Sequence, residues 1–526
     1  MAIDARLLQY RITLELASPL AIGSGDSDDL FDAPCARDAN GLPAIPGTSL
    51  AGALRSLWGR QFGELSAQAW FGSITPNTDE GERSRVLLSW AHVHDITNKA
   101  VDGLVTAATI GADLVLTHLL RLPQREHVRL DHRGGAVAKA KFDRSFVPTG
   151  CRFSFDLRVF ITVQQQEGDI GILATMWQML WQGDLWLGGA KSGGYGRTKV
   201  IAIKEVIFDL TRKGARQAAQ GARKLQGPLP EASKENGIER RTIALVGTGT
   251  RPTREVLPCI TLALRDTWRI GTGTESVAKL KDSQFNKKRA DALPYAEDRL
   301  VWKGSPGHGG QSTQWVAEVV VPGSAIRGAL AHRTTFHFNR LLRQWSRPLA
   351  PDAARAIELA LPVDVVEVLF GSAKTQGVLA GDAETTPTGH AGAVFVEDVR
   401  ISTAGVKVVQ LPHVRIDRFT GGAFGGALFS EELLFQGSLE LRVSIDKTRL
   451  LSLAQVYREA AATALKALDE ALRDLCEQRL AIGAGGAHGH GYCTGNWPTE
   501  MDATLRSLAE TLEPANEPVE PEEAPA

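Results

Sequence analysis

The amino-acid sequence predicts an α+β protein made of two tandem ferredoxin-like modules. The chain has 526 residues, and a chain of that length favours roughly two to four domains. A series of glycine-containing landmarks occurs twice in the same order. Each copy mixes strand-like alternating segments with two helical segments, and the simplest fold with that element order is the βαββαβ ferredoxin-like unit.

The first pair of landmarks is a strand that runs into a Gly-x-Gly turn. Hydrophobic residues alternate over residues 7–22 and again over residues 258–270, which is typical of strands. The turns that follow are Gly-Ser-Gly at residues 23–25 and Gly-Thr-Gly at residues 271–273. This pair is the first sign that the chain is a duplication.

The second pair is a Pro-Gly dipeptide that opens a helix. Residues 45–55 (IPGTSLAGALR) are echoed by residues 321–330 (VPGSAIRGAL). In each copy Pro-Gly interrupts the preceding segment, and a Thr or Ser is expected to supply the N-cap. The offset between copies grows from 248 residues (271 − 23) to 276 (322 − 46), so the second copy has a loop, residues 274–321, that is 28 residues longer.

Three more pairs complete the repeat. Trp-Phe-Gly-Ser at 70–73 matches Leu-Phe-Gly-Ser at 369–372, and His-Val-Arg-Leu-Asp-His at 127–132 matches His-Val-Arg-Ile-Asp-Arg at 413–418. Helices predicted over residues 170–182 and 453–480 lead into Gly-rich loops at 188–197 and 483–492. Five matched landmarks in one order indicate an internal duplication.

The landmarks place a first module at residues 1–208 and a second at residues 244–510. Residues 209–243 are charged and interrupted by Pro and Gly, which predicts a linker. The tail, residues 511–526, is rich in Pro and Glu and is predicted to be disordered.

Composition narrows the class of protein. The formal net charge is −1, so any anion binding depends on local basic patches, of which residues 121–144 are one. The five cysteines lie far apart with no CxxC pair, which argues against a structural zinc site. The N-terminus lacks a signal-peptide core and no apolar run is long enough to span a bilayer. We expect a cytoplasmic protein that does not bind membranes.

The basic region around the His-x-Arg-x-Asp segments is a candidate footprint for a phosphate backbone. Its members in the first module are His127, Arg129, Arg133, Lys139 and Lys141, and in the second His413, Arg415 and Arg418, with Phe419 and Phe424 available for stacking. The alternative is a solvated strand edge on which Asp131 and Asp417 pair with the nearby arginines.

The helix starts and Gly-rich loops are weaker candidates for binding anions. A helix N-terminus with free N–H groups attracts phosphate, and Gly lets backbone N–H groups approach one closely. The residues concerned are Thr48, Ser49 and Arg55 in the first module, Ser324 and Arg327 in the second, and Lys191 and Arg197 beside the first loop. The alternatives are ordinary helix capping and tight helix-to-strand turns.

Taken together, these residues resemble the RAMP (repeat-associated mysterious protein) superfamily of CRISPR effector subunits, and most of all the backbone subunit of type III complexes. The family's Ile-Asp-Ser-Pro and Leu-Pro-x-Ile-Pro-Gly-Ser-Ser-Leu runs are similar to residues 31–35 (FDAPC) and 42–52 (LPAIPGTSLAG). Its Ile-Asp-Arg-x-Thr segment is reproduced at residues 416–420 and its closing Gly loop at 188–197. Two such modules in one chain resemble the double backbone subunit of type III-D effectors.

The resemblance implies an RNA-recognition-like core in each module, with a palm and a projecting thumb. Such subunits stack along a CRISPR guide RNA, hold its phosphates, and use the thumb to displace a base of the guide–target duplex at regular intervals. The implied partners are therefore the guide RNA, complementary target RNA and other subunits of a type III complex.

The resemblance also implies catalysis. In the family a loop Asp directs cleavage of target RNA by a ribose 2′-hydroxyl with a divalent metal, expected to be Mg²⁺ with Mn²⁺ as the alternative. Asp32 matches that Asp and is the candidate to contact the metal. The second module has no Asp-Ser-Pro run, but its longer loop offers Asp291, which precedes Ala-Leu-Pro, and, less similar, Asp298.

Two other functions stay open at this point. The chain could be a structural subunit that binds guide RNA without cutting, because the motif is degraded in the second module. Less favoured is a guide-processing endoribonuclease of the same superfamily that uses histidine, for which His92 and His94 are the candidates.

Overall fold

The computed structural model describes residues 6–25, 33–74, 81–130, 136–161, 166–225, 227–243, 254–271, 273–282, 288–303, 312–342, 369–372, 390–456 and 458–512. The chain divides into two compact units that do not follow the halves of the sequence. Unit 1 comprises Met1–Thr253, Ile270–Pro322 and Arg400–Leu433, and unit 2 comprises Arg254–Arg269, Gly323–Val399 and Leu434–Ala526.

The core sheet of unit 1 has the ferredoxin-like strand order. Its central strand β1 (Arg6–Leu16) pairs antiparallel with β10 (Thr198–Asp209) on one side and with β9 (Arg152–Ile161) on the other. Strands β5 (Val86–Leu88) and β6 (Ala91–Val93) then pair with β9, and β2 (Ala44–Ile45) pairs with β6. The first strand thus lies between the third and fourth, as the predicted βαββαβ order requires.

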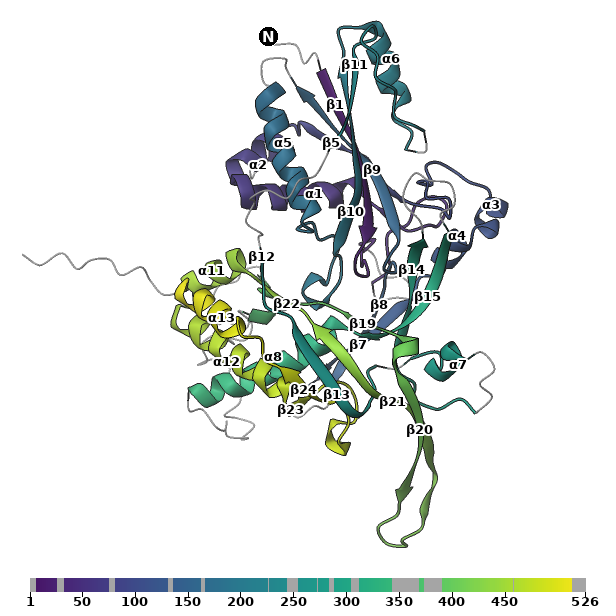
Figure 1. The fold of residues 1–526 in the computed structure, drawn as a ribbon, viewed down its shortest axis with the longest axis vertical. Coiled ribbons are helices and arrows are strands. Elements are labelled where there is room, and N and C mark those ends of the chain that lie inside the picture. Colours follow the sequence, from purple (N-terminus) through teal and green to yellow (C-terminus); the bar gives the residue numbers. More distant parts are fainter. Residues whose placement is uncertain are drawn as a thin grey trace, which may run out of the picture. The chain divides into compact units, whose positions relative to one another are not determined.

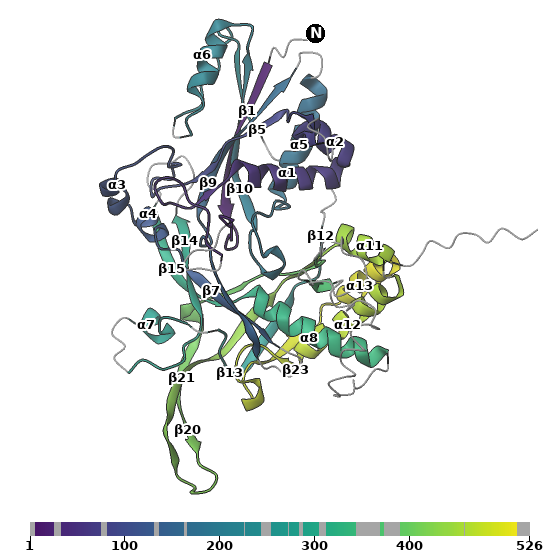
Figure 2. The same cartoon turned by 180° about the vertical axis from the view of Figure 1, so that it is seen from behind.

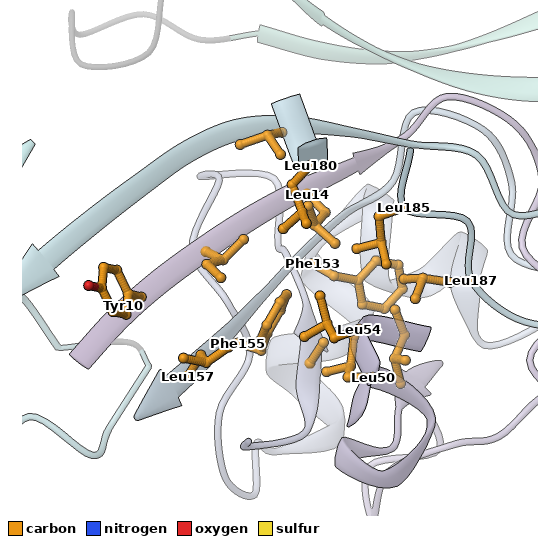
Figure 3. Packing of buried hydrophobic residues seen from close by; sticks show 14 of the residues in the cluster. Tyr10, Leu14, Leu50, Leu54, Phe153, Phe155, Leu157, Leu180, Leu185 and Leu187 are labelled. Carbon is orange, nitrogen blue, oxygen red and sulfur yellow. The ribbon is translucent and has the colours of Figure 1, made fainter. Parts of the chain in front are cut away.

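Three helices cover one face of this sheet: α1 (Gly47–Phe62), α2 (Glu64–Phe71) and α5 (Gln166–Trp181). Figures 1 and 2 show them on the same side of β1 and β9. In α1 the buried residues are Leu50, Leu54, Leu57 and Trp58, a spacing that puts one apolar stripe on the sheet. Figure 3 shows this packing, in which Leu50 and Leu54 lie near Phe153 and Phe155. Burying each such side chain contributes about 1.5–3 kcal/mol.

The segment predicted to be a linker, residues 209–243, is instead part of unit 1. It contains α6 (Lys213–Gly221) and β11 (Ile238–Thr242), and β11 pairs with β10 at the edge of the sheet. Phe208, Ala215 and Ala219 are buried together in this region. Although its composition is that of a linker, its small apolar residues recur at helical spacing, so they can pack on the second face of the sheet.

A buried arginine also holds this segment in place. Arg11 on β1 pairs with Asp156 on β9 through a 2.9 Å contact between its Nε and the Oδ1 of the carboxylate. Its guanidinium donates further hydrogen bonds to the backbone carbonyls of Ala222 and Leu225 at 3.1 Å each. A buried charge that satisfies several carbonyls fixes the path of the chain it touches.

Residues 274–321, predicted to be a longer loop, contain one helix and two strands of unit 1 in their described part. They contain α7 (Val277–Lys281) and the antiparallel strands β14 (Ala296–Lys303) and β15 (Ser312–Val321). β15 also pairs with β19 (Val399–Ser402). Leu300 belongs to the same buried core as β1 and α1, and its N–H donates to the carbonyl of Thr149 at 3.0 Å. The extra residues of the second copy therefore complete the core of the first.

Unit 2 repeats the same topology. Strand β13 (Ile260–Trp268) lies between β24 (Tyr492–Asn496) and the second half of β21 (Ala423–Leu441), and β22 (Val443–Asp446), which follows β21, pairs with β18 (Val394–Val396). The helices α8 (Gly323–Leu341) and α12 (Arg458–Cys476) correspond to α1 and α5. Both modules are therefore ferredoxin-like, as predicted. The described part of this unit also contains β12 (Arg254–Val256), β16 (Gly371–Ser372), β17 (His390–Ala391), α11 (Lys447–Val456), β23 (Glu477–Ala481), a 3-10 helix (Gly486–His488) and α13 (Met501–Glu510).

Two boundaries in unit 2 differ from the predictions. The helix expected over residues 453–480 is described as α11 and α12, with residue 457 between them outside the described residues, and it ends at Cys476 because the next residues pair with β24 as β23. Of the tail predicted to be disordered, residues 513–526 lie outside the described part of the chain. Leu512, just after α13, is buried.

Each module carries one long β-hairpin, and both hairpins lie in unit 1. Hairpin 1 is β7 (Gln124–Leu130) with β8 (Ala136–Ser145), and hairpin 2 is β20 (Lys407–Ile416) with the first half of β21. Figure 1 shows hairpin 2 projecting beyond the strands at its base. These hairpins have the place in the fold that the resemblance assigns to the thumbs.

Candidate functional site

The two hairpins share a stacked pair of rings near their bases. In hairpin 1 the rings of His127 and Phe142 are 5.0 Å apart and 18° from parallel. In hairpin 2 those of His413 and Phe429 are 4.9 Å apart and 20° from parallel. The stack gives a structural register in which positions of one module can be matched to positions of the other.

Counted from the stacked Phe of each hairpin, the two loops that carry the candidate acids form backbone hydrogen bonds with equivalent hairpin residues. Three residues after Phe142, the N–H of Ser145 donates to the carbonyl of Ala33 at 3.3 Å. Three residues after Phe429, the N–H of Glu432 donates to the carbonyl of Ala292 at 2.9 Å. Ala33 and Ala292 are therefore equivalent, and the residues that precede them in the chain are Asp32 and Asp291. Asp32 itself lies outside the described residues.

Asp291 is an exposed carboxylate held at the base of hairpin 2. Its Oδ2 accepts hydrogen bonds from the N–H of Ser430 at 2.8 Å and from the Ser430 hydroxyl at 3.1 Å. Its own N–H donates to the carbonyl of Ser430 at 2.9 Å. The backbone hydrogen bond from Ser430 is the main reason that the pKa of Asp291 lies below its ordinary value. The group is therefore ionised and its position is defined.

Asp298 is placed differently from Asp291. It lies within β14, opposite Ala317 of β15, and its carboxylate is 3.5 Å from Nε2 of His118. His118, in α4 (Leu114–Leu119), stacks on Trp315 with ring centroids 4.0 Å apart. Asp298 thus contributes to the contact that holds the β14–β15 pair on unit 1, and it does not occupy the loop position that the sequence suggested.

The N-termini of the two Pro-Gly helices do not have the features predicted for anion binding. In α1 the N-cap is Pro46 and no side chain caps the helix, so the prediction that Thr48 or Ser49 supplies the cap is wrong. The reason is that the helix already begins at Gly47, which leaves both residues inside its first turn. In α8 the N–H of Gly323 donates to Oδ1 of Asp398 at 2.8 Å. A carboxylate of the chain therefore occupies the anion position at the start of α8, one residue before Ser324.

The arginines of these helices also bind backbone. Arg55 donates from Nη1 to the carbonyl of Gly72 at 2.9 Å and from Nη2 to Glu64 at 2.6 Å. Arg327 donates to the carbonyl of Phe370, and burial lowers its pKa. Both guanidinium groups thus tie the Pro-Gly helix to the Phe-Gly landmark of the same module, which explains why these two landmarks occur together.

The Gly-rich loops are tight turns against neighbouring backbone. A Cβ on Gly188 would lie 2.3 Å from the carbonyl oxygen of Ala21, and one on Gly196 would lie 1.9 Å from that of Leu187. Gly491 meets Ile482 in the same way at 2.1 Å. These contacts require glycine without any ligand, and they favour the turn over a phosphate cradle. Lys191 lies in a short 3-10 helix within the first loop, and the guanidinium of Arg197 lies 5.9 Å from the ring of Trp186.

Hairpin 2 presents apolar and cationic side chains to solvent. Phe419 is 99% exposed and Leu428 is 74% exposed. The guanidinium of Arg415 lies 5.3 Å from the centre of the Phe424 ring, and Arg418 is exposed in the turn. Asp417 caps that turn by accepting from the N–H of Phe419 at 2.9 Å. The motif acid is therefore a turn residue and its arginine neighbours remain on the surface.

On hairpin 1, fewer of the predicted basic side chains belong to the described residues. Lys141 is 66% exposed and forms a 3.0 Å ion pair with Glu126. The side chains of Arg129 and Lys139, and all of Asp131 and Arg133, lie outside the described part of the structure. Of the predicted residues, His127 and Lys141 are thus placed on this hairpin.

The two histidines considered for guide processing lie in unit 1 at β6. His94 is 5% exposed, and its two ring nitrogens bind Ser154 at 2.8 Å and Asn98 at 2.9 Å. His92 lies 3.9 Å from a carboxylate oxygen of Asp38. His94 is committed to buried partners, so it lacks the access to RNA that proton transfer to a substrate requires.

The residues that were described form no group of three or more His, Cys, Asp or Glu side chains that could hold a metal ion. An exposed carboxylate such as Asp291 fits a different kind of site. Mg²⁺ commonly keeps several waters and binds one or two carboxylates together with substrate phosphates. At the base of hairpin 2, Asp291 would supply one such carboxylate.

Sequence reasoning missed the role of Glu297. This side chain is buried on β14 and contacts Arg125 of β7 and Arg400 of β19. A single acid in a strand gives no motif, and its partners lie 172 and 103 residues away in the chain. Ser430, which holds Asp291, was also missed for the same reason.

No helix in the described part of the chain is long and apolar enough to cross a membrane. No curated protein matches the chain. The family model of the RAMP superfamily matches residues 13–199 and 304–494, one range in each copy of the repeat and together well over half of the chain. The chain therefore belongs to the RAMP superfamily.

Proposed function

We propose that this protein is a backbone subunit of a type III CRISPR effector, of the double type found in subtype III-D. It binds guide RNA along its two hairpins and cleaves complementary target RNA. Members of the RAMP superfamily bind guide RNA in CRISPR systems. The exposed Phe419 and the cationic Arg415 and Arg418 on hairpin 2 are the side-chain types that stack on bases and pair with phosphates.

One observation carries the catalytic part of the proposal. The backbone contacts of Ala33 and Ala292 to their hairpins are equivalent, and in the sequence each of these alanines directly follows an aspartate, Asp32 or Asp291. Both copies of the repeat therefore have an Asp at this point of the sequence, although the surrounding sequence has diverged. We assign each carboxylate to one cut in the target RNA.

The reaction assigned to each site is attack of a ribose 2′-hydroxyl on the adjacent phosphorus. The hydroxyl proton leaves, the new O–P bond forms a cyclic phosphate, and the 5′ oxygen departs with a proton. Asp291, ionised and anchored by Ser430, is suited to orient that hydroxyl for in-line attack. A bound Mg²⁺ would stabilise the charge that develops on the phosphate. The guide supplies sequence choice by base pairing, while the protein contacts shape and phosphates.

The test is to purify the complex with its guide RNA and partner subunits and to map the cuts in target RNA, with and without a chelator. Asp32→Asn and Asp291→Asn should each remove one cut, and the double variant should remove both, while target binding is retained. Asp298→Asn is the matched control, since that acid pairs with His118, and it should keep every cut.

Three results would decide against parts of this proposal. Unchanged cutting by both single variants would reject the two assigned acids. A wild-type complex that binds target but makes no metal-dependent cuts would identify a structural RNA-binding subunit. Cleavage of precursor guide RNA by the isolated chain without metal would identify a processing enzyme.

A further inference from the structure

A single buried carboxylate, Glu297, joins the strands that support the two hairpins. Its side chain is 2% exposed. Its Oε1 accepts hydrogen bonds from Nε of Arg125 at 2.5 Å and from the hydroxyl of Tyr295 at 2.8 Å. Its Oε2 accepts from Nη2 of Arg400 at 2.7 Å. All four residues lie in unit 1.

The first arm of this network reaches hairpin 1. Arg125 lies on β7, two residues before His127, and its side chain is 2% exposed. Its guanidinium also lies 4.8 Å from the ring centre of Tyr195 and 5.2 Å from that of Phe146. Aromatic rings around a buried guanidinium restrict its orientation and add cation–π attraction. The base of hairpin 1 is thus held directly by Glu297.

The second arm reaches hairpin 2. Arg400 lies on β19, seven residues before β20 begins at Lys407. Its side chain is 13% exposed, and its Nη1 lies 3.5 Å from Glu318 of β15. Lys281 of α7 donates to the carbonyl of Val406 at 2.5 Å, which fixes the residue before β20. The residues that lead into hairpin 2 are therefore also fixed by contacts to β14, β15 and α7.

The third arm reaches the loop of Asp291. Tyr295, four residues later in the chain, donates its hydroxyl to Glu297 and its N–H to the carbonyl of Ile270 at 3.0 Å. Burial by itself would raise the pKa of Glu297, but the two arginines outweigh it and hold the pKa below its ordinary value. A charged group of this kind is costly to bury unless every partner is in place, so the network favours one geometry.

We propose that Glu297 is a positioning residue that locks the two hairpins at one fixed separation, so that they engage RNA as a single frame and not as two independent arms. The proposal rests on the RNA-binding function proposed above. Neither hairpin contains Glu297, and its side chain is buried beneath them, away from solvent. Its effect is to set the spacing between the two places where the protein contacts the RNA.

The experiment measures that spacing without RNA in the full chain. Spin labels are attached to Glu126→Cys on hairpin 1 and Thr420→Cys on hairpin 2, both exposed, in a background where the exposed Cys259 is replaced by Ser. Pulsed electron resonance then reports the distribution of distances between the labels. The wild-type network should give one narrow peak, and Glu297→Gln should lose it in favour of a broad distribution.

Two further variants make the result specific. Asp156→Asn removes a partner of Arg11 in the same unit whose side chain is 4% exposed and, within the described part of the chain, forms no hydrogen bond or ion pair with either hairpin. This variant should keep the narrow peak. Arg400→Gln removes only the contact between Glu297 and the strand that leads into hairpin 2, and it should also broaden the distance peak. This variant keeps Glu297 and Arg125, so it tests the proposal even if Glu297→Gln fails to fold. Circular dichroism verifies folding for each variant.

The outcomes separate this inference from the proposed function. A narrow peak in folded Glu297→Gln or Arg400→Gln, or equal broadening in Asp156→Asn, would overturn the positioning role. Footprints on bound RNA supply the second readout: two protected stretches should keep one separation in the wild type and lose it in Glu297→Gln. If the wild type binds no RNA, the proposed function fails while the distance result still stands.

Discussion

At the scale of single residues, the structure separates side chains that serve the fold from those that face solvent. Arg55 and Arg327 were predicted to bind RNA, but each donates to a backbone carbonyl of its own module. Phe419 and Arg418 lie exposed on hairpin 2. A cationic residue in a basic patch is thus informative only once its partners are known, because the same guanidinium can satisfy a carbonyl or a phosphate.

His127 gives a prediction about pH. Burial, followed by the nearby Arg144 and Arg125, lowers its pKa from 6.5 to about 4. Between these values the unfolded chain binds a proton that the folded chain does not, so stability rises with pH across that window. We expect the free energy of unfolding to fall as pH drops from about 6.5 to about 4, and to fall less in His127→Gln. Urea unfolding at several pH values measures it, and equal pH dependence in both proteins would contradict it.

At the scale of elements, the hairpins are the parts of the fold that present a binding surface. In the described part of the chain, strands β7 and β8 pair only with each other, and β20 pairs with β21, whose second half pairs with β13 in unit 2. Hairpin 2 exposes Phe419, Leu428 and Phe424, and several large exposed apolar side chains on one element commonly mark an interaction site. Because these side chains are exposed, they are available for recognition.

Phe419→Ala on hairpin 2 tests this surface. We expect the affinity for guide RNA to weaken by about 1–3 kcal/mol, the usual contribution of one base stacked on an aromatic ring. The melting temperature should not change, because the side chain is 99% exposed. Leu65→Ala on α2, 83% exposed, is the matched control. Equal RNA affinities for both variants and the wild type, measured by filter binding, would refute the role of Phe419.

At the scale of the whole molecule, the two copies of the repeat are not two independent domains. Segments 270–322 and 400–433 of the second copy belong to unit 1. Trp302 donates from Nε1 to the carbonyl of Gly150 at 2.8 Å, and Arg152 lies 4.4 Å from the centre of the Trp302 ring. The first module therefore relies on residues that the second copy supplies.

A fragment of residues 1–243 should accordingly be less stable than the same residues in the full chain. Without Leu300 and Trp302 the core near Thr149 and Gly150 is open, and loss of a large buried side chain costs about 2–5 kcal/mol. Hydrogen exchange should show lower protection over residues 147–153 in the fragment. Co-expression with residues 244–526 should restore it, and equal protection in the fragment and full chain would contradict the dependence.

The sequence by itself determined the duplication, the ferredoxin-like class and the family. Hydrophobic periodicity and glycine at positions such as Gly196, where backbone approaches closely, are local requirements that a sequence records directly. The matched His-x-Arg-x-Asp segments begin on β7 in one copy and on β20 in the other, although their sequence alone did not predict a hairpin there. These features follow from contacts between residues that are near one another in the chain or repeated in it.

Only the tertiary structure decided which residues act together. The equivalence of Ala33 and Ala292, the anchoring of Asp291 by Ser430, and the joining of Arg125, Glu297 and Arg400 all depend on contacts across more than 100 residues of sequence. Such pairs leave no spacing pattern, since the chain between them is free to vary. Residues 209–243 have the composition of a linker but are part of a core in unit 1. Whether a segment is buried depends on the surface it packs against, here the second face of the sheet, as well as on its own composition.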